Sequence, residues 1–168
     1  MRRVLVIGSP GAGKTTLAAK LAAKLDLPVH YLDRHHWEPG WKYRDAARAR
    51  ERVQAICDTA AWVMDGNFSE TFDLRLPRAD TLIWLDYPRA TCIRRILVRT
   101  IKDYGRPKPD LPDGCPESLD IGVLRFAWEF PVRRRPEISA GIGRFGGHLR
   151  VIQLRNDREA AAFLREAA

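Results

Sequence analysis

Gly-Ser-Pro-Gly-Ala-Gly-Lys-Thr, residues 8–15, directly follows the apolar run Val-Leu-Val-Ile at residues 4–7. The eight residues match the pattern G-x-x-x-x-G-K-[ST], which is typical of a loop that wraps a polyphosphate. A match to four constrained positions seldom arises by chance in a chain of 168 residues. Because an apolar strand precedes the loop and a helical pattern follows it, we expect a phosphate-binding loop for a nucleoside triphosphate.

The residue types of this loop fit that chemistry. Its glycines let successive backbone N–H groups point inward, and the helix that follows adds its positive end. Lys14 is expected to reach the β- and γ-phosphates, Thr15 to bind Mg²⁺, and Thr16 to lie near the α-phosphate. The residues expected to contact the nucleotide are Gly8, Ser9, Pro10, Gly11, Ala12, Gly13, Lys14, Thr15 and Thr16. The alternative, a glycine turn with a solvated Lys14, explains neither the Lys-Thr pair nor the preceding strand.

The composition is that of an ordinary globular domain, with 45% hydrophobic residues. The length predicts one domain over residues 1–168. No apolar run approaches the length of a membrane span, and the apolar part of the N-terminus is too short for a signal peptide. We therefore expect a cytoplasmic protein. Neither a disulfide framework nor a metal site is expected from Cys57, Cys92 and Cys115, because none belongs to a C-x-x-C pair.

The formal net charge of +8 is compatible with nucleic acid or with a cleft for anionic ligands. No basic run is interleaved with aromatic residues, as in proteins that bind single strands. Many of the cations gather after the fourth expected strand: Arg94, Arg95, Arg99, Lys102, Arg106 and Lys108. This distribution favours phosphate chemistry and leaves nucleic-acid binding as the alternative.

Strand and helix patterns alternate along the chain. Strands are expected at residues 4–7, 28–32, 61–64, 81–85 and 148–154, and helices at 14–25, 45–59, 90–101, 119–130, 133–141 and 157–166. Residues 34–41 and 104–117 are expected to be loops, and Asp157 is expected to cap the last helix. The alternation predicts an α/β fold of three layers, α/β/α, with parallel strands joined by right-handed crossovers.

The phosphate loop, Asp33 after the second strand and Trp-Val-Met-Asp-Gly-Asn at residues 62–67 resemble the nucleoside-monophosphate-kinase and shikimate-kinase group of P-loop proteins. Further segments, at residues 32–41, 76–86 and 106–117, are similar to adenylate-kinase-like proteins described as DNA-topology modulation proteins. The resemblance implies a P-loop NTPase fold with five parallel strands in the order 2-3-1-4-5. It also implies an acceptor-binding region over residues 33–60 and a short lid over residues 103–118.

Two carboxylates follow strands where open α/β sheets bind ligands. The resemblance implies that Asp33 contacts the phosphate acceptor, and that Asp65 holds Mg²⁺ together with Thr15, partly through water. The alternative for each is a residue that caps a turn.

Arg95 and Arg99 lie four residues apart, so one helix face carries both. The resemblance implies that they grip the transferring phosphoryl group, and the alternative is an exposed basic face. In place of the D-G-x-P-R motif of adenylate kinases, the chain has Asp-Gly-Asn-Phe from residue 65. Arg75 and Arg78 are the candidates to replace the missing arginine, and the acceptor need not be AMP.

The expected lid carries Arg106 and Lys108, which could reach phosphate when it closes; a static surface loop is the alternative. After the last strand, Asn156 is expected at the nucleotide base, with a helix cap as its alternative. Trp37 and Trp41 fit either packing or stacking on the acceptor. The adjacent His35 and His36 make a poor metal chelate.

Taken together, the residues predict an enzyme: an ATP- and Mg²⁺-dependent P-loop kinase that moves the γ-phosphoryl group to a small molecule or a nucleotide. Its catalytic residues are expected to be Lys14, Asp33, Arg95 and Arg99. The alternatives are an ATP-binding regulatory protein associated with DNA topology and a plain NTPase. We expect no membrane partner and a monomer or dimer. The sequence leaves the acceptor and the preference for ATP over GTP open.

Overall fold

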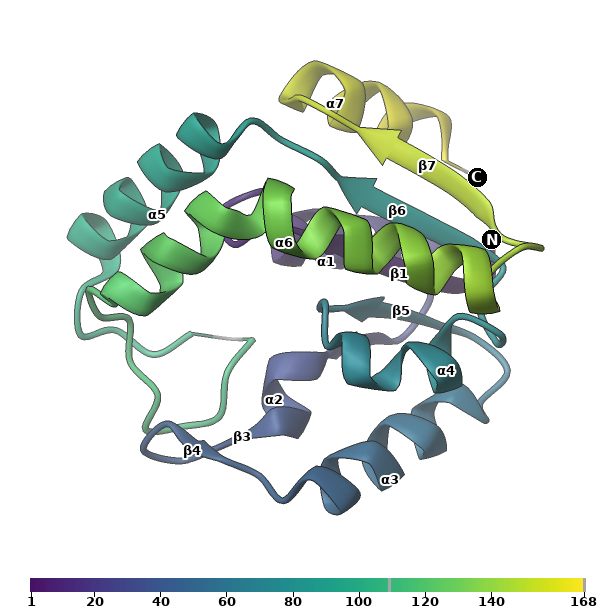
Figure 1. The fold of residues 1–168 in the computed structure, drawn as a ribbon, viewed down its shortest axis with the longest axis horizontal. Helices are drawn as coiled ribbons and strands as arrows, with labels where there is room; N and C mark the ends of the chain where they lie inside the picture. The colour runs from purple at the N-terminus through teal and green to yellow at the C-terminus, as the bar shows by residue number, and fades with distance from the viewer. Residues whose placement is uncertain (109, 168) are drawn as a thin grey trace.

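The computed structural model describes residues 1–108 and 110–167 and consists of one large parallel sheet covered by helices (Figure 1). The five strands are β1 (Arg3–Gly8), β2 (Val29–Tyr31), β5 (Trp62–Asp65), β6 (Thr81–Leu85) and β7 (Arg150–Leu154). They pair in the order β2-β5-β1-β6-β7, and every pairing is parallel. The predicted three-layer α/β fold with strand order 2-3-1-4-5 is therefore confirmed.

The central strand β1 is buried on both faces because its apolar run has helices on each side. Val4 and Val6 point into one cluster of buried side chains, whereas Leu5 and Ile7 point into the other. The first cluster is closed by α1 (Lys14–Leu25) and α7 (Asp157–Glu166). The second is closed by α3 (Ala46–Cys57), α4 (Phe72–Arg75) and α6 (Ile121–Phe145), the last of which crosses in front of the sheet in Figure 1. Period-two alternation thus produces the three layers.

One long helix, α6, replaces the two helices predicted at 119–130 and 133–141. Pro131 and Pro136 lie inside it. Each proline removes one backbone N–H from the helix. Phe130 and Ile138, on either side of Pro131, are buried against the same face of the sheet, so packing of the apolar stripe holds the segment as one helix.

The segment predicted as a loop over residues 34–41 contains regular structure. A short helix α2 (Leu32–His36) follows β2, and an antiparallel hairpin follows that, with β3 (Trp37–Glu38) paired to β4 (Lys42–Tyr43). The Trp37 ring packs edge-on against Trp41 and Tyr43, with ring centroids 5.6 and 5.1 Å away. These aromatic contacts stabilise the pairing of the two very short strands.

The remaining elements are a 3-10 turn (Ser69–Thr71) before α4 and the helix α5 (Arg89–Asp103) after β6. Residues 104–108 and 110–120 between α5 and α6 are irregular, which confirms the loop predicted over 104–117 for its described residues, whereas the helix predicted from residue 119 begins at Ile121. Pro109, within the expected lid, and Ala168 lie outside the described residues. All three cysteines are buried free thiols. No helix in the described parts of the chain has the length and apolar character that a bilayer crossing requires.

Candidate functional site

The predicted phosphate loop joins β1 to α1 at the carboxyl edge of the sheet. Gly8 and Gly11 have φ angles of +149° and +77°, which side chains disfavour. A Cβ at Gly8 would lie 2.5 Å from the backbone oxygen of Leu85, and one at Gly11 would lie 2.3 Å from that of Cys92. Only glycine fits at either position, so the turn depends on these residues.

Hydrogen bonds place two side chains that follow the glycines of the loop, Lys14 and Thr15. Lys14 Nζ donates to the backbone oxygen of Ser9 at 3.2 Å, so the ammonium lies over the loop. Thr15 Oγ1 donates to Asp65 Oδ2 at 2.7 Å. Thr16, the next residue of α1, is exposed. Residues 15 and 65, which lie 50 positions apart in the sequence, are therefore in direct contact, and their role as Mg²⁺ ligands stays a prediction.

Asp65 ends β5 and is 5% exposed. Its Oδ1 is buried and has no hydrogen-bond partner among the described residues. Burial raises the pKa of Asp65, and the charge of Lys14 and the hydrogen bond from Thr15 oppose that rise. A buried carboxylate oxygen that lacks a partner, beside a threonine hydroxyl, suits a hard cation.

The oxygens of Thr15 and Asp65 suit a Mg²⁺ ion that keeps several waters, and they are too few for a cation coordinated by protein side chains alone. No cluster of three or more His, Cys, Asp or Glu side chains able to hold a metal ion occurs within residues 1–108 and 110–167. Magnesium commonly keeps several waters and takes only one or two protein ligands together with the phosphates of its substrate. Thr15 and Asp65 supply two such oxygens.

Asp33, which follows the second strand β2, lies near Asp65 and Lys14. It lies in the first turn of α2, directly after β2, and is half-buried. Burial and the neighbouring charge of Asp65 raise the pKa of Asp33 to about 6, against opposing attraction from Lys14. Asp110 raises the same pKa and Lys108 lowers it, so the 104–120 segment also contributes charge here.

The 104–120 segment contacts the site on two sides, the phosphate loop and the β3–β4 hairpin. Asp110 Oδ2 lies 3.4 Å from Thr15 Oγ1, next to the phosphate loop. On the other side, Gly40 N donates to Gly114 O at 3.1 Å, and Cys115 Sγ donates to the Glu38 backbone oxygen at 3.4 Å. Cys115, 1% exposed, is therefore buried against the β3–β4 hairpin.

The arginines predicted to be catalytic lie one helical turn apart on α5 and have different partners. Arg95 forms an ion pair with Asp157 at 2.5 Å and donates to the Ala12 backbone oxygen at 3.4 Å, beside the phosphate loop. Arg99 Nε lies 2.9 Å from Glu117 Oε2. The structure brings Arg95 to the loop, whereas Arg99 faces the 104–120 segment.

Glu117 is an acidic anchor that the sequence analysis missed. It is 3% exposed and receives Lys108 at 2.7 Å and Thr100 at 3.1 Å in addition to Arg99. Burial alone would raise the pKa of Glu117, but the hydrogen bond from Lys108 and the charge of Arg99 outweigh burial and lower it. Arg106, which was predicted beside Lys108 as a phosphate contact, is exposed and pairs with Asp103.

The side chain of Asn156 is used as a helix cap. Its Oδ1 accepts from Glu159 N at 3.0 Å, and its Nδ2 donates to Glu159 Oε1 at 2.7 Å. The prediction that Asp157 caps α7 was wrong by one residue, because Asp157 lies in the first turn and binds Arg95 instead. Any contact of Asn156 with a nucleotide base remains a prediction.

Neither arginine proposed to replace the missing motif residue is free at the site. Arg75 is completely buried and binds backbone oxygens that follow β5. Arg78 pairs with the exposed Asp58.

The aromatic residues predicted beside the acceptor differ in exposure. His36 is 2% exposed and stacks on Phe68, whereas Trp37 is half-buried and Trp41 is 40% exposed.

Comparison with known proteins gives several similarities. The family model for ATPases associated with various cellular activities (AAA) matches residues 4–86. An adenylate kinase of Anaeromyxobacter sp. (strain Fw109-5) is 34% identical over 110 residues, 61% of this chain and 48% of that protein. A chloroplastic protein of Arabidopsis thaliana, named a probable inactive ATP-dependent zinc metalloprotease (FTSHI 5), is 39% identical over 74 residues, 44% of this chain and 5% of that protein.

Among solved structures, shikimate kinase from Bacteroides thetaiotaomicron has a TM-score of 0.56 at 18% identity, over 98% of this chain and 94% of its own. The matches to the two curated relatives span less than half of either relative's length. The fold, the phosphate loop and these comparisons together define the class of protein. It is an α/β P-loop protein whose sheet has the kinase-like strand order.

Proposed function

We propose that the chain is an ATP- and Mg²⁺-dependent phosphotransferase that acts on a small-molecule or nucleotide acceptor. The proposal rests chiefly on the hydrogen bond from Thr15 of the phosphate loop to Asp65, with Asp33 near enough for the charges of Asp65 and Lys14 to act on its pKa. The name of the similar adenylate kinase and that of the structurally similar shikimate kinase agree with phosphoryl transfer.

The chain's residues fit the parts of this reaction. The inward backbone N–H groups of the loop and Lys14 would bind the β- and γ-phosphates. Thr15 and Asp65 would hold Mg²⁺ at the phosphates, partly through water, and the bound ion would neutralise developing negative charge. Arg95, beside the loop, would stabilise the transferring group, and Arg99 would do so with the 103–118 lid.

Asp33 would act on the acceptor bound over residues 33–60. The acceptor oxygen forms a bond to the γ-phosphorus while the bond from that phosphorus to the β–γ bridging oxygen breaks, and ADP leaves. If the acceptor is a hydroxyl group, its proton passes to the carboxylate of Asp33. A pKa of about 6 leaves Asp33 ionised at neutral pH and still basic enough to take a proton.

The alternative of a DNA-associated regulatory protein draws on the net charge of +8. The basic run on α6 gives it little support, because each arginine has an acidic partner. Arg133 pairs with Glu129, Arg134 with Glu137, and Arg135 with Asp86. Steeply salt-dependent DNA binding would nevertheless be the mark of that function.

The test is transfer of the γ-phosphoryl group from labelled ATP with Mg²⁺ to a panel of nucleoside monophosphates and small hydroxy metabolites. Wild type, Lys14→Ala and the exposed helix control Lys20→Ala are compared. We expect a labelled product with wild type and Lys20→Ala that Lys14→Ala does not form. Release of phosphate to water without any labelled acceptor would instead indicate a plain NTPase.

A further inference from the structure

The three residues that follow Asp65 connect the nucleotide side of the site to the acceptor side. Asn67 lies opposite the start of the phosphate loop. Its Oδ1 accepts from Gly8 N at 3.0 Å, and its Nδ2 donates to Gly8 O at 2.9 Å. A side-chain amide thus binds both backbone groups of Gly8, the residue at which β1 leaves the sheet.

This contact continues the pairing of β1 with β5 beyond its last backbone bond. The register of the two strands ends at Val6 opposite Asp65, and Gly66 N donates to Val6 O at 3.1 Å. Gly8 has a φ of +149°, so its backbone departs from an ordinary strand. The Asn67 amide supplies the partners that a neighbouring strand no longer provides.

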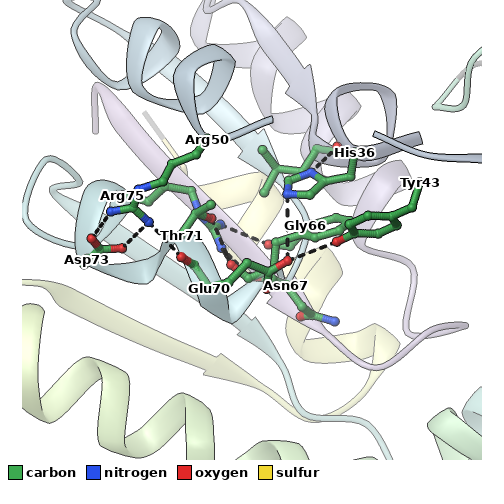
Figure 2. Close-up of polar contacts among 11 residues, drawn as sticks. His36, Tyr43, Arg50, Gly66, Asn67, Glu70, Thr71, Asp73 and Arg75 are labelled. Atoms are coloured by element: carbon green, nitrogen blue, oxygen red, sulfur yellow. Dashed lines mark hydrogen bonds and ion pairs between the residues drawn. The ribbon is translucent and has the colours of Figure 1, made fainter. Parts of the chain in front are cut away.

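Arg75 fixes the backbone on which Asn67 sits. Figure 2 draws Arg75 together with Gly66, Asn67 and Thr71, and Arg75 is completely buried. It donates to Gly66 O at 3.1 Å, to Phe68 O at 2.9 Å and to Asn67 O. Its Nε donates to Thr71 Oγ1 at 2.8 Å. One charged group therefore satisfies three consecutive carbonyl oxygens directly after Asp65.

The same loop reaches the acceptor side through Phe68. Its ring stacks on His36, with ring centroids 3.4 Å apart and planes 16° apart. His36 Nδ1 is hydrogen-bonded to Leu32 O at 2.9 Å, one residue before Asp33. His36 Nε2 also lies 3.9 Å from Glu70, which accepts from Tyr43 of the hairpin (Figure 2).

We infer that Asn67 and Arg75 are positioning residues, which hold Gly8 of the phosphate loop, Asp65 and the Phe68–His36 contact in one fixed arrangement. Neither side chain needs to touch substrate. Asn67 acts on nucleotide binding through Gly8, and Arg75 acts through the backbone that carries Asn67. The effect on nucleotide affinity rests on the proposed function, whereas the effect on the Gly8 backbone does not.

The principal variant is Asn67→Ala, because Asn67 is only half-buried and its loss opens no large cavity. The matched control is Gln54→Ala, which removes a side-chain amide that makes an exposed hydrogen bond to Asp58. Amide hydrogen exchange of Gly8, affinity for MgATP and for adenosine, and thermal unfolding are measured on the full chain.

We expect Asn67→Ala to speed exchange of the Gly8 amide about tenfold or more, since its acceptor is gone. MgATP affinity should fall by a similar factor, while adenosine binding changes less than twofold, because the loop contacts the phosphates and not the base. Gln54→Ala should leave Gly8 exchange, MgATP affinity and adenosine affinity unchanged. Arg75→Lys, which keeps the charge but cannot reach four acceptors, should weaken MgATP in the same way.

Two outcomes separate this inference from the proposed function. Unchanged Gly8 exchange or unchanged MgATP affinity in folded Asn67→Ala overturns the inference and leaves the proposed function standing. A wild-type chain that binds no MgATP removes the proposed function, and Gly8 exchange then still decides whether Asn67 fixes the loop. If Arg75→Lys fails to fold, the Asn67→Ala comparison decides alone.

Discussion

Replacing Asp33 by asparagine should stabilise the folded chain while it abolishes phosphoryl transfer. Burial and the charge of Asp65 raise the pKa of Asp33 from 3.8 to about 6. At pH 8 the folded protein therefore holds an ionised carboxylate in a place that disfavours its charge. Asparagine has nearly the same shape and no charge, so it removes that cost together with the proposed proton acceptor.

The size of the effect follows from the pKa difference. A change from 3.8 to about 6 corresponds to about 3 kcal/mol of unfolding free energy at full ionisation. Lost attraction to Lys14 and Lys108 is already part of that balance. For a chain of this length, about 2–3 kcal/mol should raise the melting temperature by about 5–10 °C.

The pH dependence has a definite sign. The pKa of Asp33 is higher in the folded state, so between pH 4 and 6 the folded state binds more protons than the unfolded state. Wild-type stability relative to Asp33→Asn must fall as pH rises through this window. The difference in melting temperature should be near zero at pH 4 and fully developed above about pH 7.

The assay is thermal unfolding of wild type, Asp33→Asn and the exposed loop control Asp113→Asn at pH 4, 6 and 8. Acceptor-dependent transfer by wild type should rise with pH through about 6 as Asp33 ionises. A melting temperature for Asp33→Asn equal to or below that of wild type at pH 8 would show that the ionised Asp33 does not destabilise the fold.

Three further changes probe other parts of the site. Glu117→Gln should lower the unfolding free energy by about 2 kcal/mol in urea titrations, because the positive charges of Lys108 and Arg99 lose their buried partner; an unchanged midpoint would contradict the anchor role. Gly11→Ala should lower the melting temperature and weaken MgATP binding at least about tenfold, because its Cβ would overlap the Cys92 backbone oxygen; calorimetry that shows wild-type affinity would be incompatible with this loop geometry. Asp65→Asn should raise the Mg²⁺ concentration needed for half-maximal ATP binding about tenfold or more, and an unaltered Mg²⁺ titration would speak against Asp65 as a ligand.

The sheet was predictable because its strands carry a strong local signal. Residues 81–85 and 157–166 were predicted with the bounds that β6 and α7 have. Continuous apolar runs mark strands buried on both faces, and the phosphate-loop pattern fixes where β1 ends. The strand order came from the resemblance, because no local pattern says which strand lies beside β1.

What the sequence did not show depends on contacts between distant segments. Helix propensity stops at Pro131, yet packing on the sheet carries α6 past it. The partners of Arg75 and Glu117 lie up to 18 residues away in the sequence, and no regular spacing predicts which residues they bind. The phosphate loop is the opposite case, since the pattern of eight adjacent residues predicted its place without any distant contact.

Calorimetric titration of MgATP into wild type, Lys14→Ala and Lys20→Ala tests most directly whether residues 8–15 bind a nucleotide. We expect saturable binding by wild type and by Lys20→Ala, and affinity at least about a hundredfold weaker for Lys14→Ala, because a charge-assisted contact to two phosphates is lost. Wild type that binds no nucleotide, or Lys14→Ala that binds as tightly as wild type, would contradict the claim that residues 8–15 form a working phosphate loop.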